Sequence, residues 1–257
     1  MIKSYVINMS KDSDRLQSFK KQFDRLGLEY ERIPGVDGHQ MPETDYEAFK
    51  NARPRDHKKG WMRGQMGCLL SHRLAWEAIA NGDQPVCAVF EDDLHISDGL
   101  QSLLRTDSWV PAGTDLIRLE PSTNRVRLGK HKLASFEERD FNTVLSTTWC
   151  TGAYLITREA AQRLVDVPPE RHQPVDVMLY CVEEPVLSPP LNIAQCSPAP
   201  CIQDKFLNPD NQRFSSNIEH NEIKPGTGGV APSRLSPKSI FGAGRRTLLN
   251  YQRVKYR

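Results

Sequence analysis

The sequence lacks several features that would assign it to a class at once. Neither charge is in excess: 34 Lys and Arg stand against 32 Asp and Glu, with a formal net charge of +2. This balance argues against nucleic-acid binding driven by overall charge. No apolar run approaches the length of about 20 residues that spans a bilayer. The first residues, MIKSYVINMS, lack the apolar core of a secretory signal. We therefore expect a cytoplasmic protein that does not bind nucleic acid.

Paired cysteines are also missing. The chain has six cysteines, without a CxxC motif or the paired spacing of metal ligands: Cys68, Cys87, Cys150, Cys181, Cys196 and Cys201. Most of them lie in apolar surroundings, so we expect reduced and mostly buried thiols. The nearest pair, in CSPAPC, has no second ligand pair that would complete a zinc site.

The spacing of apolar residues predicts an α/β fold. A strand over residues 4–9 precedes a helix over residues 11–26, in which Phe19 and Phe23 share one face, and a strand over residues 30–33 follows. Strand, helix and strand in this order favour parallel pairing. Further helices are predicted over residues 65–80, 158–165 and 175–181, and further strands over 86–90, 115–120, 143–146 and 153–157.

Two regions carry no such pattern. Residues 40–63 are polar and rich in charge and proline, which predicts a long loop of the kind that often serves a site. From about residue 184 regular spacing gives way to proline-rich sequence. The last 25 residues contain seven basic and no acidic residues, interleaved with apolar ones. Such a tail either lies on an anionic membrane surface or is a solvated terminus.

Three adjacent carboxylates, Glu91, Asp92 and Asp93, follow the apolar strand VCAVF. In open α/β sheets, ligands bind beyond the carboxyl ends of the strands. Neighbouring carboxylates repel one another unless water or a cation screens them. Mg²⁺ and Mn²⁺ take one or two such oxygens and complete their shell with water and substrate phosphates. The cluster therefore suggests a metal that bridges the protein to a diphosphate, and a solvated acidic turn is the alternative.

Six segments in this order together resemble glycosyltransferase family 25, which includes bacterial lipooligosaccharide galactosyltransferases and collagen-modifying relatives. They are VINMSKDSDRLQSFKKQF near the start, GQMGCLLSHRLAW, VCAVFEDDLHIS, DLIRLE, TTWCTGAYLITREAAQRL and HQPVDVMLY. The resemblance implies a GT-A-like, Rossmann-type catalytic domain over residues 1–205 with a mostly parallel central sheet. The irregular, basic segment over 206–257 would then contact the acceptor or the membrane.

The same resemblance implies an activity. It is the inverting, metal-dependent transfer of galactose from UDP-galactose to a core sugar of a lipid-linked oligosaccharide, with Mn²⁺ or Mg²⁺. Its place would be the cytoplasmic face of a bacterial inner membrane. The residue chemistry itself does not distinguish galactose from glucose or N-acetylglucosamine.

Site residues follow from the matching motifs. By resemblance, Asp93 would ligate the metal most directly, and Glu91 would contact the ribose or a metal-bound water. The donor contacts so implied are Asn8, Arg15, Asp37, Ser71, His72, Glu91, Asp92, Gly152 and Gln203. Some of these have plainer explanations: Arg15 as an exposed helix arginine, Asp37 as part of an Asp-Gly turn, and His72 as a packing residue. His95, His172 and His220 are further candidate ligands that no spacing singles out.

An inverting displacement also needs a base that takes the proton of the acceptor hydroxyl. Asp176 in QPVDVML is the first candidate and Glu120, at the end of DLIRLE, is the alternative. Asp176 as a plain negative charge at a helix N-terminus remains open.

Three other functional classes remain as alternatives. A Mg²⁺-dependent nucleotidyltransferase would usually add a glycine-rich basic loop, which the stretch after VINMS lacks. A glycosidase would work without a metal. A non-catalytic sugar-binding module would have no reason to crowd three carboxylates together.

Overall fold

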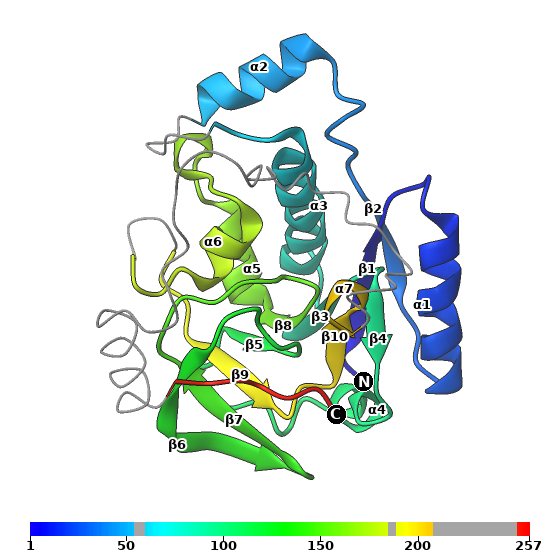
Figure 1. The fold of residues 1–257 in the computed structure, drawn as a ribbon, viewed down its shortest axis with the longest axis vertical. Coiled ribbons are helices and arrows are strands. Elements are labelled where there is room, and N and C mark those ends of the chain that lie inside the picture. Colours follow the sequence, from blue (N-terminus) through cyan, green and yellow to red (C-terminus); the bar gives the residue numbers. More distant parts are fainter. Residues whose placement is uncertain (54–59, 185–188, 208–250) are drawn as a thin grey trace, which may run out of the picture.

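A nine-stranded sheet forms the middle layer of the protein, with helices on both of its faces (Figure 1). The computed structural model describes residues 1–53, 60–184, 189–207 and 251–257. The strands are β1 (Lys3–Asn8), β2 (Glu31–Pro34), β3 (Val86–Glu91), β4 (Leu94–Ile96), β5 (Leu116–Arg118), β6 (Val126–Phe136), β7 (Arg139–Val144), β8 (Ala153–Thr157), β9 (Ile193–Ser197), β10 (Cys201–Gln203) and β11 (Tyr251–Gln252). The helices are α1 (Ser13–Arg25), α2 (Glu43–Ala52), α3 (Arg63–Ala80), α4 (Leu100–Arg105), α5 (Arg158–Val165), the 3₁₀ turn η1 (Pro169–Arg171), α6 (Val175–Tyr180) and α7 (Asp204–Leu207).

The strands lie in the order β11-β6-β7-β9-β5-β8-β3-β1-β2. β1 pairs in parallel with β2 and with β3, and β5 pairs in parallel with β9. β8 runs antiparallel between β3 and β5. Following all pairings, β1, β2, β3, β5, β6 and β9 point one way, and β7, β8 and β11 point the other. The predicted α/β fold with a mostly parallel central sheet is confirmed.

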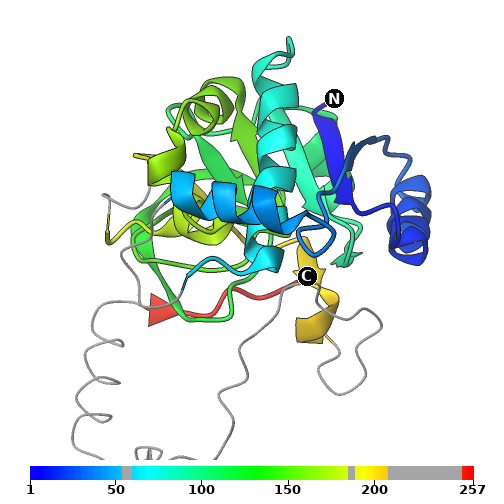
Figure 2. The ribbon, with the colours of Figure 1, turned by 90° about the horizontal axis from the view of Figure 1, so that it is seen from above.

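The apolar run of β3 is explained by cover on both faces of the strand. Cys87 and Val89 pack into the hydrophobic cluster of α3 and α5, whereas Ala88 and Phe90 pack into the cluster of α1 and α4. Figure 2 shows β1 between α1 and α3, as Figure 1 does. Because a strand buried on both sides needs no polar face, its sequence is continuously apolar.

β1 is the topological switch point of the sheet. β2 lies on one side of β1 and β3 on the other, with α1 and α3 on opposite faces of the sheet. At such a point the connecting segments diverge and leave a crevice at the carboxyl ends of the strands. Ile7 of β1 lies opposite Glu91 of β3, so the acidic cluster opens into this crevice.

The sequence pattern missed some elements. The predicted loop over residues 40–63 is wrong in part, because α2 occupies Glu43–Ala52. Only Phe49 of this helix is buried, with its ring 5.1 Å from that of Trp61. One buried position in ten residues is too few to mark a helical period. After residue 184, where the sequence shows no pattern, β9 and β10 still form.

The last residues, 251–257, lie against the body of the protein. Tyr251 and Gln252 pair with β6, and Arg257 donates its backbone N–H to the carbonyl of Ala199. Residues 208–250, with much of the basic tail and His220, lie outside the described residues, so the division at residue 205 stays a prediction. No helix in the described ranges is both long and apolar enough to cross a bilayer.

Candidate active site

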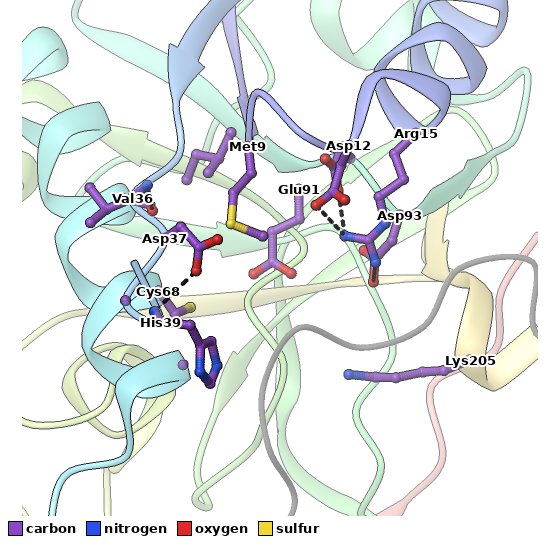
Figure 3. Close-up of a pocket in the computed structure, with 15 residues that line it drawn as sticks. Met9, Asp12, Arg15, Val36, Asp37, His39, Cys68, Glu91, Asp93 and Lys205 are labelled. Atoms are coloured by element: carbon purple, nitrogen blue, oxygen red, sulfur yellow. Dashed lines mark hydrogen bonds and ion pairs between the residues drawn. The ribbon is translucent and has the colours of Figure 1, made fainter. Parts of the chain in front are cut away.

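Two adjoining pockets open at the carboxyl ends of β1, β2 and β3. The strand-end pocket has a volume of about 720 Å³, including space open to solvent, and is lined by Asp12, Arg15, Asp37 and Asp93 among others (Figure 3). The outer pocket, of about 1100 Å³ on the same measure, is lined by Trp149, Thr151, Asp176, Gln203 and Phe206 among others. Cys68, Glu91 and Lys205 line both pockets, so the two meet at Glu91.

Glu91 is held by donors from three separate segments. Its Oε1 accepts hydrogen bonds from Thr151 Oγ1 at 2.7 Å and from His72 Nε2 at 3.2 Å, and its Oε2 accepts one from Gln203 Nε2 at 3.0 Å. Burial alone would raise the pKa of Glu91, but the bonds from His72 and Thr151 and the charge of Lys205 lower it to about 2. Glu91 is therefore a fixed carboxylate with a permanent negative charge.

A relay of buried side chains orients the ring of His72. Trp76 Nε1 donates to the hydroxyl of Tyr154 at 2.8 Å, and that hydroxyl lies 2.9 Å from His72 Nδ1. Because the indole N–H is already a donor to the oxygen, the hydroxyl proton is directed to Nδ1. With Nδ1 as the acceptor, the proton of the ring lies on Nε2 and points to Glu91. His72 therefore contacts Glu91 from within the protein, and its contact with the donor stays a prediction.

Asp92 lines the strand-end pocket and is bound by two side chains. Its Oδ2 accepts from Asn8 Nδ2 at 2.7 Å, and its Oδ1 accepts from Arg15 Nη1 at 3.0 Å. Burial raises the pKa of Asp92 to about 6, although Arg15 and Asn8 oppose the shift. Asn8 is 2% exposed and also accepts a hydrogen bond from Arg32 Nε. Asn8 therefore braces the ends of β1, β2 and β3, whereas Arg15 also lines the strand-end pocket.

One oxygen of Asp93 has no partner among the described residues. Its Oδ1 is buried and accepts no hydrogen bond within the described part of the chain, and its Oδ2 lies 4.0 Å from Arg15 Nη2. Burial and the charge of Glu91 raise the pKa of Asp93 to about 7. A raised pKa and an oxygen without a donor are both expected of a carboxylate whose charge is meant to be neutralised by a bound cation. Asp93 and Glu91 thus fit a hard divalent cation such as Mg²⁺ or Mn²⁺.

A second set of ligand atoms lies nearby. Atoms of Cys68, His72 and Glu91 lie within 4.8 Å of one another. A soft metal would need a thiolate and a free Nε2 lone pair. Burial raises the pKa of Cys68 well above its usual range, and the relay places a proton on Nε2 of His72. The carboxylates therefore fit a metal better than this set does. All six cysteines are free thiols, as predicted.

Glu120 lies behind the pockets. It is 1% exposed and lines neither pocket. Its Oε1 accepts from the backbone N–H of Gly152 at 2.5 Å, whereas Oε2 is buried without a partner among the described residues. An added Cβ at Gly152 would lie 3.0 Å from this Oε2 and 2.9 Å from Gln203 Nε2. A larger residue at position 152 would therefore force the side chain of Gln203 or Glu120 to shift.

Asp176 faces the outer pocket from the first turn of α6. Its side chain is half-buried, and its Oδ1 accepts from the backbone N–H of Val177 at 2.9 Å. Pro174 precedes the helix and lines the same pocket. The structure therefore separates the two predicted bases, with Asp176 at the pocket and Glu120 inside the protein.

The remaining predicted residues are Asp37, Ser71, His95 and His172. Asp37 lines the strand-end pocket and pairs with Lys11 Nζ at 2.6 Å, which lowers its pKa. Ser71 joins α3 to the segment after β2, because its hydroxyl accepts from Val36 N and donates to the Gly67 carbonyl. His95 pairs with Asp204, and His172 packs against Arg53, so neither faces the carboxylates.

Lys205 and Trp149 are among the pocket residues that the sequence pattern missed. Lys205 follows Gln203 and Asp204, which are anchored to the acidic turn: Gln203 by its bond to Glu91, Asp204 by its backbone N–H to the Asp93 carbonyl at 2.9 Å. The positive charge of Lys205 lowers the pKa of both Glu91 and Asp93. A single lysine in a proline-rich stretch gives no local indication of this position.

Comparison with known proteins gives matches over most of the chain. The model of a family described as glycosyltransferase family 25 (LPS biosynthesis protein) matches residues 1–179. The lacto-N-neotetraose biosynthesis glycosyltransferase LgtE of Neisseria gonorrhoeae is 28% identical over 233 residues, which is 85% of this chain and 81% of that protein. The lipooligosaccharide biosynthesis protein lex-1 of Haemophilus influenzae is 28% identical over 172 residues, covering 63% of this chain and 56% of that one. Among solved structures, a glycosyltransferase involved in glycosylation of the major capsid of PBCV-1 matches with a TM-score of 0.41 and 8% identity, over 79% of this chain and 91% of that one.

Proposed function

Because the chain belongs to glycosyltransferase family 25, we propose that it transfers galactose from UDP-galactose to a core sugar of a lipooligosaccharide, with inversion at the sugar. The reaction class follows from the family, and the relatives named for lacto-N-neotetraose and lipooligosaccharide biosynthesis support the acceptor class. The observation that carries the mechanism is the buried oxygen of Asp93, which has no hydrogen-bond partner in the described ranges and lines the same pocket as the carboxylate of Glu91.

The donor binds in the strand-end pocket. Asp93 and Glu91 would hold Mn²⁺ or Mg²⁺, which as a Lewis acid stabilises the charge that gathers on a departing diphosphate. Lys205 adds a positive charge where the two pockets meet, close to where that charge develops. Asp37 and Arg15 line the same pocket and offer an acceptor and a donor to the nucleoside and phosphates.

The acceptor approaches from the outer pocket. Its hydroxyl oxygen forms the new bond to C1 of the galactose, while the bond from C1 to the diphosphate oxygen breaks and its electron pair leaves with UDP. Asp176 takes the proton of that hydroxyl. Asp176 is preferred to Glu120 as the base because Asp176 is half-buried at the pocket, whereas Glu120 lines neither pocket. Glu91, which has a low pKa, stays charged throughout.

The place of action also belongs to the proposal. A lipid-linked acceptor made in the cytoplasm would be met at the inner face of the bacterial inner membrane. The basic C-terminal residues would favour peripheral contact with anionic lipid there, since each basic residue near such a surface contributes about 1 kcal/mol.

The test is an assay of UDP release with a panel of UDP-sugars and Mn²⁺ or Mg²⁺, with and without EDTA. Release should be highest with UDP-galactose, and both EDTA and Asp93→Asn should abolish it. Asp176→Asn should lower transfer by a factor of about 10² to 10⁴, the usual contribution of a general base, with the affinity for UDP and metal measured by calorimetry unchanged.

Asp98→Asn is the matched control. Asp98 follows the same turn, its side chain is 80% exposed, and it lines neither pocket. This variant should behave as the wild type. Full activity in the presence of EDTA, or in Asp93→Asn, would show that the carboxylate pair does not hold a metal. Lost donor affinity in Asp176→Asn would move Asp176 from the acceptor to the donor side.

A further inference from the structure

Building on the proposed function, we infer that Trp149 is the platform on which a pyranose ring of the saccharide acceptor stacks, so that the outer pocket is the acceptor subsite. Three features of Trp149 support this role: the exposure of its side chain, the hydrogen bonds to its backbone and the residues around it.

Trp149 differs from the other tryptophans of the chain. Trp61, Trp76 and Trp109 are 5%, 0% and 7% exposed, whereas Trp149 is 36% exposed and lines the outer pocket. Phe206, which is 37% exposed, lines the same pocket. Two large aromatic side chains thus leave apolar surface open at one concave site, where a ligand would cover it.

The backbone of Trp149 is fixed from beneath by a buried arginine. Arg118, which is 0% exposed, donates from Nη2 to the Trp149 carbonyl at 2.8 Å and from Nη1 to the Cys150 carbonyl at 3.3 Å. Its Nε donates to Gln195 Oε1 at 3.0 Å, and its guanidinium lies 4.2 Å from the centre of the Tyr180 ring. Burial of a guanidinium is stable only where such hydrogen bonds compensate for the lost hydration.

Two further features hold the same segment. The Trp149 backbone N–H donates to Ser122 Oγ at 3.0 Å, and Cys150 has a φ of 78°, a left-handed conformation that a non-glycine residue rarely adopts. Thr151 next binds Glu91, which ties the segment to the carboxylates. Trp149 is therefore presented on a rigid support, and a rigid aromatic surface loses little conformational entropy when it binds a ligand.

The pocket offers the groups that a sugar needs. A pyranose has faces made largely of C–H bonds and an edge of hydroxyl groups. The electron-rich face of an indole attracts C–H groups, while Thr151, Asp176 and Gln203 present polar atoms around the same pocket. The occupant that fits this lining is a saccharide whose terminal ring lies on Trp149 with a hydroxyl toward Asp176.

Intrinsic fluorescence tests this directly, because Trp149 is the single tryptophan of four that is not buried. With UDP and Mn²⁺ present, the protein is titrated with methyl β-glucoside, methyl β-galactoside, methyl β-N-acetylglucosaminide and lactose. At least one of these should change the emission in a saturable way in the wild type, and the change should be absent in Trp149→Phe. If none changes the emission, or if the change persists in Trp149→Phe, the inference is wrong.

Kinetics with the saccharide that binds gives the second readout. Trp149→Ala should raise the acceptor KM at least about tenfold, equivalent to about 1.4 kcal/mol, with a smaller rise in Trp149→Phe and a donor KM changed less than about twofold. Leu133→Ala is the control, since Leu133 is 46% exposed on β6 and lines neither pocket. An unchanged acceptor KM in Trp149→Ala would overturn the inference. Failure of the proposed function would appear differently, as no UDP release from any UDP-sugar, whatever the titration shows.

Discussion

Replacing Glu120 by Gln should make the protein more stable at alkaline pH. The Glu120 side chain is 1% exposed, and of its two oxygens only Oε1 has a donor, the backbone N–H of Gly152. Burial, reinforced by the charges of Glu91 and Asp93, raises the pKa of Glu120 to about 8 against the opposing effect of Arg118. At neutral pH the native protein therefore holds a proton on Glu120 that the unfolded chain has released.

The sign and size of the effect follow from this difference. Below pH 4.5 Glu120 is protonated in both the native and the unfolded state, so it contributes no pH dependence to the stability. Between pH 4.5 and about 8 only the native state holds the proton, so the free energy of unfolding falls as the pH rises. Each pKa unit corresponds to about 1.4 kcal/mol, and the shift from 4.5 to about 8 gives an upper limit of about 5 kcal/mol. That is a sizeable part of the 5 to 15 kcal/mol by which a domain is usually stable.

Glutamine should remove this dependence without loss of the native contact. Its amide oxygen still accepts from Gly152, and its NH₂ group supplies a donor beside Gln203, whose own Oε1 is buried without a partner in the described structure. Urea unfolding followed by circular dichroism, in steps from pH 5.5 to 8.5, measures the effect. The stability of Glu120→Gln relative to wild type should rise by up to about 1.4 kcal/mol per pH unit. Parallel stability curves would refute a native-state proton on Glu120.

The same variant decides between the two candidate bases. A protonated carboxyl inside the protein cannot take a proton from an acceptor hydroxyl, so Glu120→Gln should catalyse glycosyl transfer at a rate within about threefold of wild type. A loss of about 10² or more in kcat, with unchanged donor affinity, would assign the base to Glu120. Asp176 would then be a helix N-terminal charge only.

Two other variants test the supports of the site. In Gly152→Ala the added Cβ would lie 2.9 Å from Gln203 Nε2, so the hydrogen bond from Gln203 to Glu91 should break. The Kd for UDP with Mn²⁺, measured by calorimetry, should then rise about tenfold. An unchanged Kd would contradict a role of Gly152 in keeping this hydrogen bond. Burial lowers the pKa of His172 to about 4 from 6.5, so only the unfolded chain gains a proton between these values, and the native state loses stability as the pH falls through this window. The drop in Tm from pH 7 to pH 5 should be smaller in His172→Gln, and equal drops would exclude His172 as its source.

Elements with strong local patterns could be predicted from the sequence. α1 shows its buried face through Phe19 and Phe23, and β3 shows burial on both sides through five consecutive apolar residues. The elements that were missed depend on distant partners. β10 is three residues long and exists through its pairing with β4, and α2 is held mainly by Phe49 against Trp61. A local pattern cannot encode such contacts, because the partner lies elsewhere in the chain.

The donors around Glu91 were hidden for the same reason. Thr151 lies 60 residues and Gln203 112 residues away in sequence from the glutamate that they bind. The local sequence around each residue indicates only a structural role: the start of a strand near Thr151, and an irregular proline-rich segment around Gln203. Resemblance to the family pointed to Gln203, whereas the residue chemistry alone did not.

The roles within the acidic triplet, in contrast, could not be predicted from alternation along a strand. Only Glu91 belongs to β3, whereas Asp92 and Asp93 form the turn that leads to β4, so the rule that successive side chains of a strand point to opposite sides does not extend to them. All three carboxylates line the strand-end pocket. They differ in their partners, because Glu91 and Asp92 accept side-chain hydrogen bonds, whereas Oδ1 of Asp93 accepts none among the described residues. Asn8 and Arg15, which bind Asp92, lie 84 and 77 residues from it in sequence, so the local sequence cannot show which carboxylate stays open to a ligand.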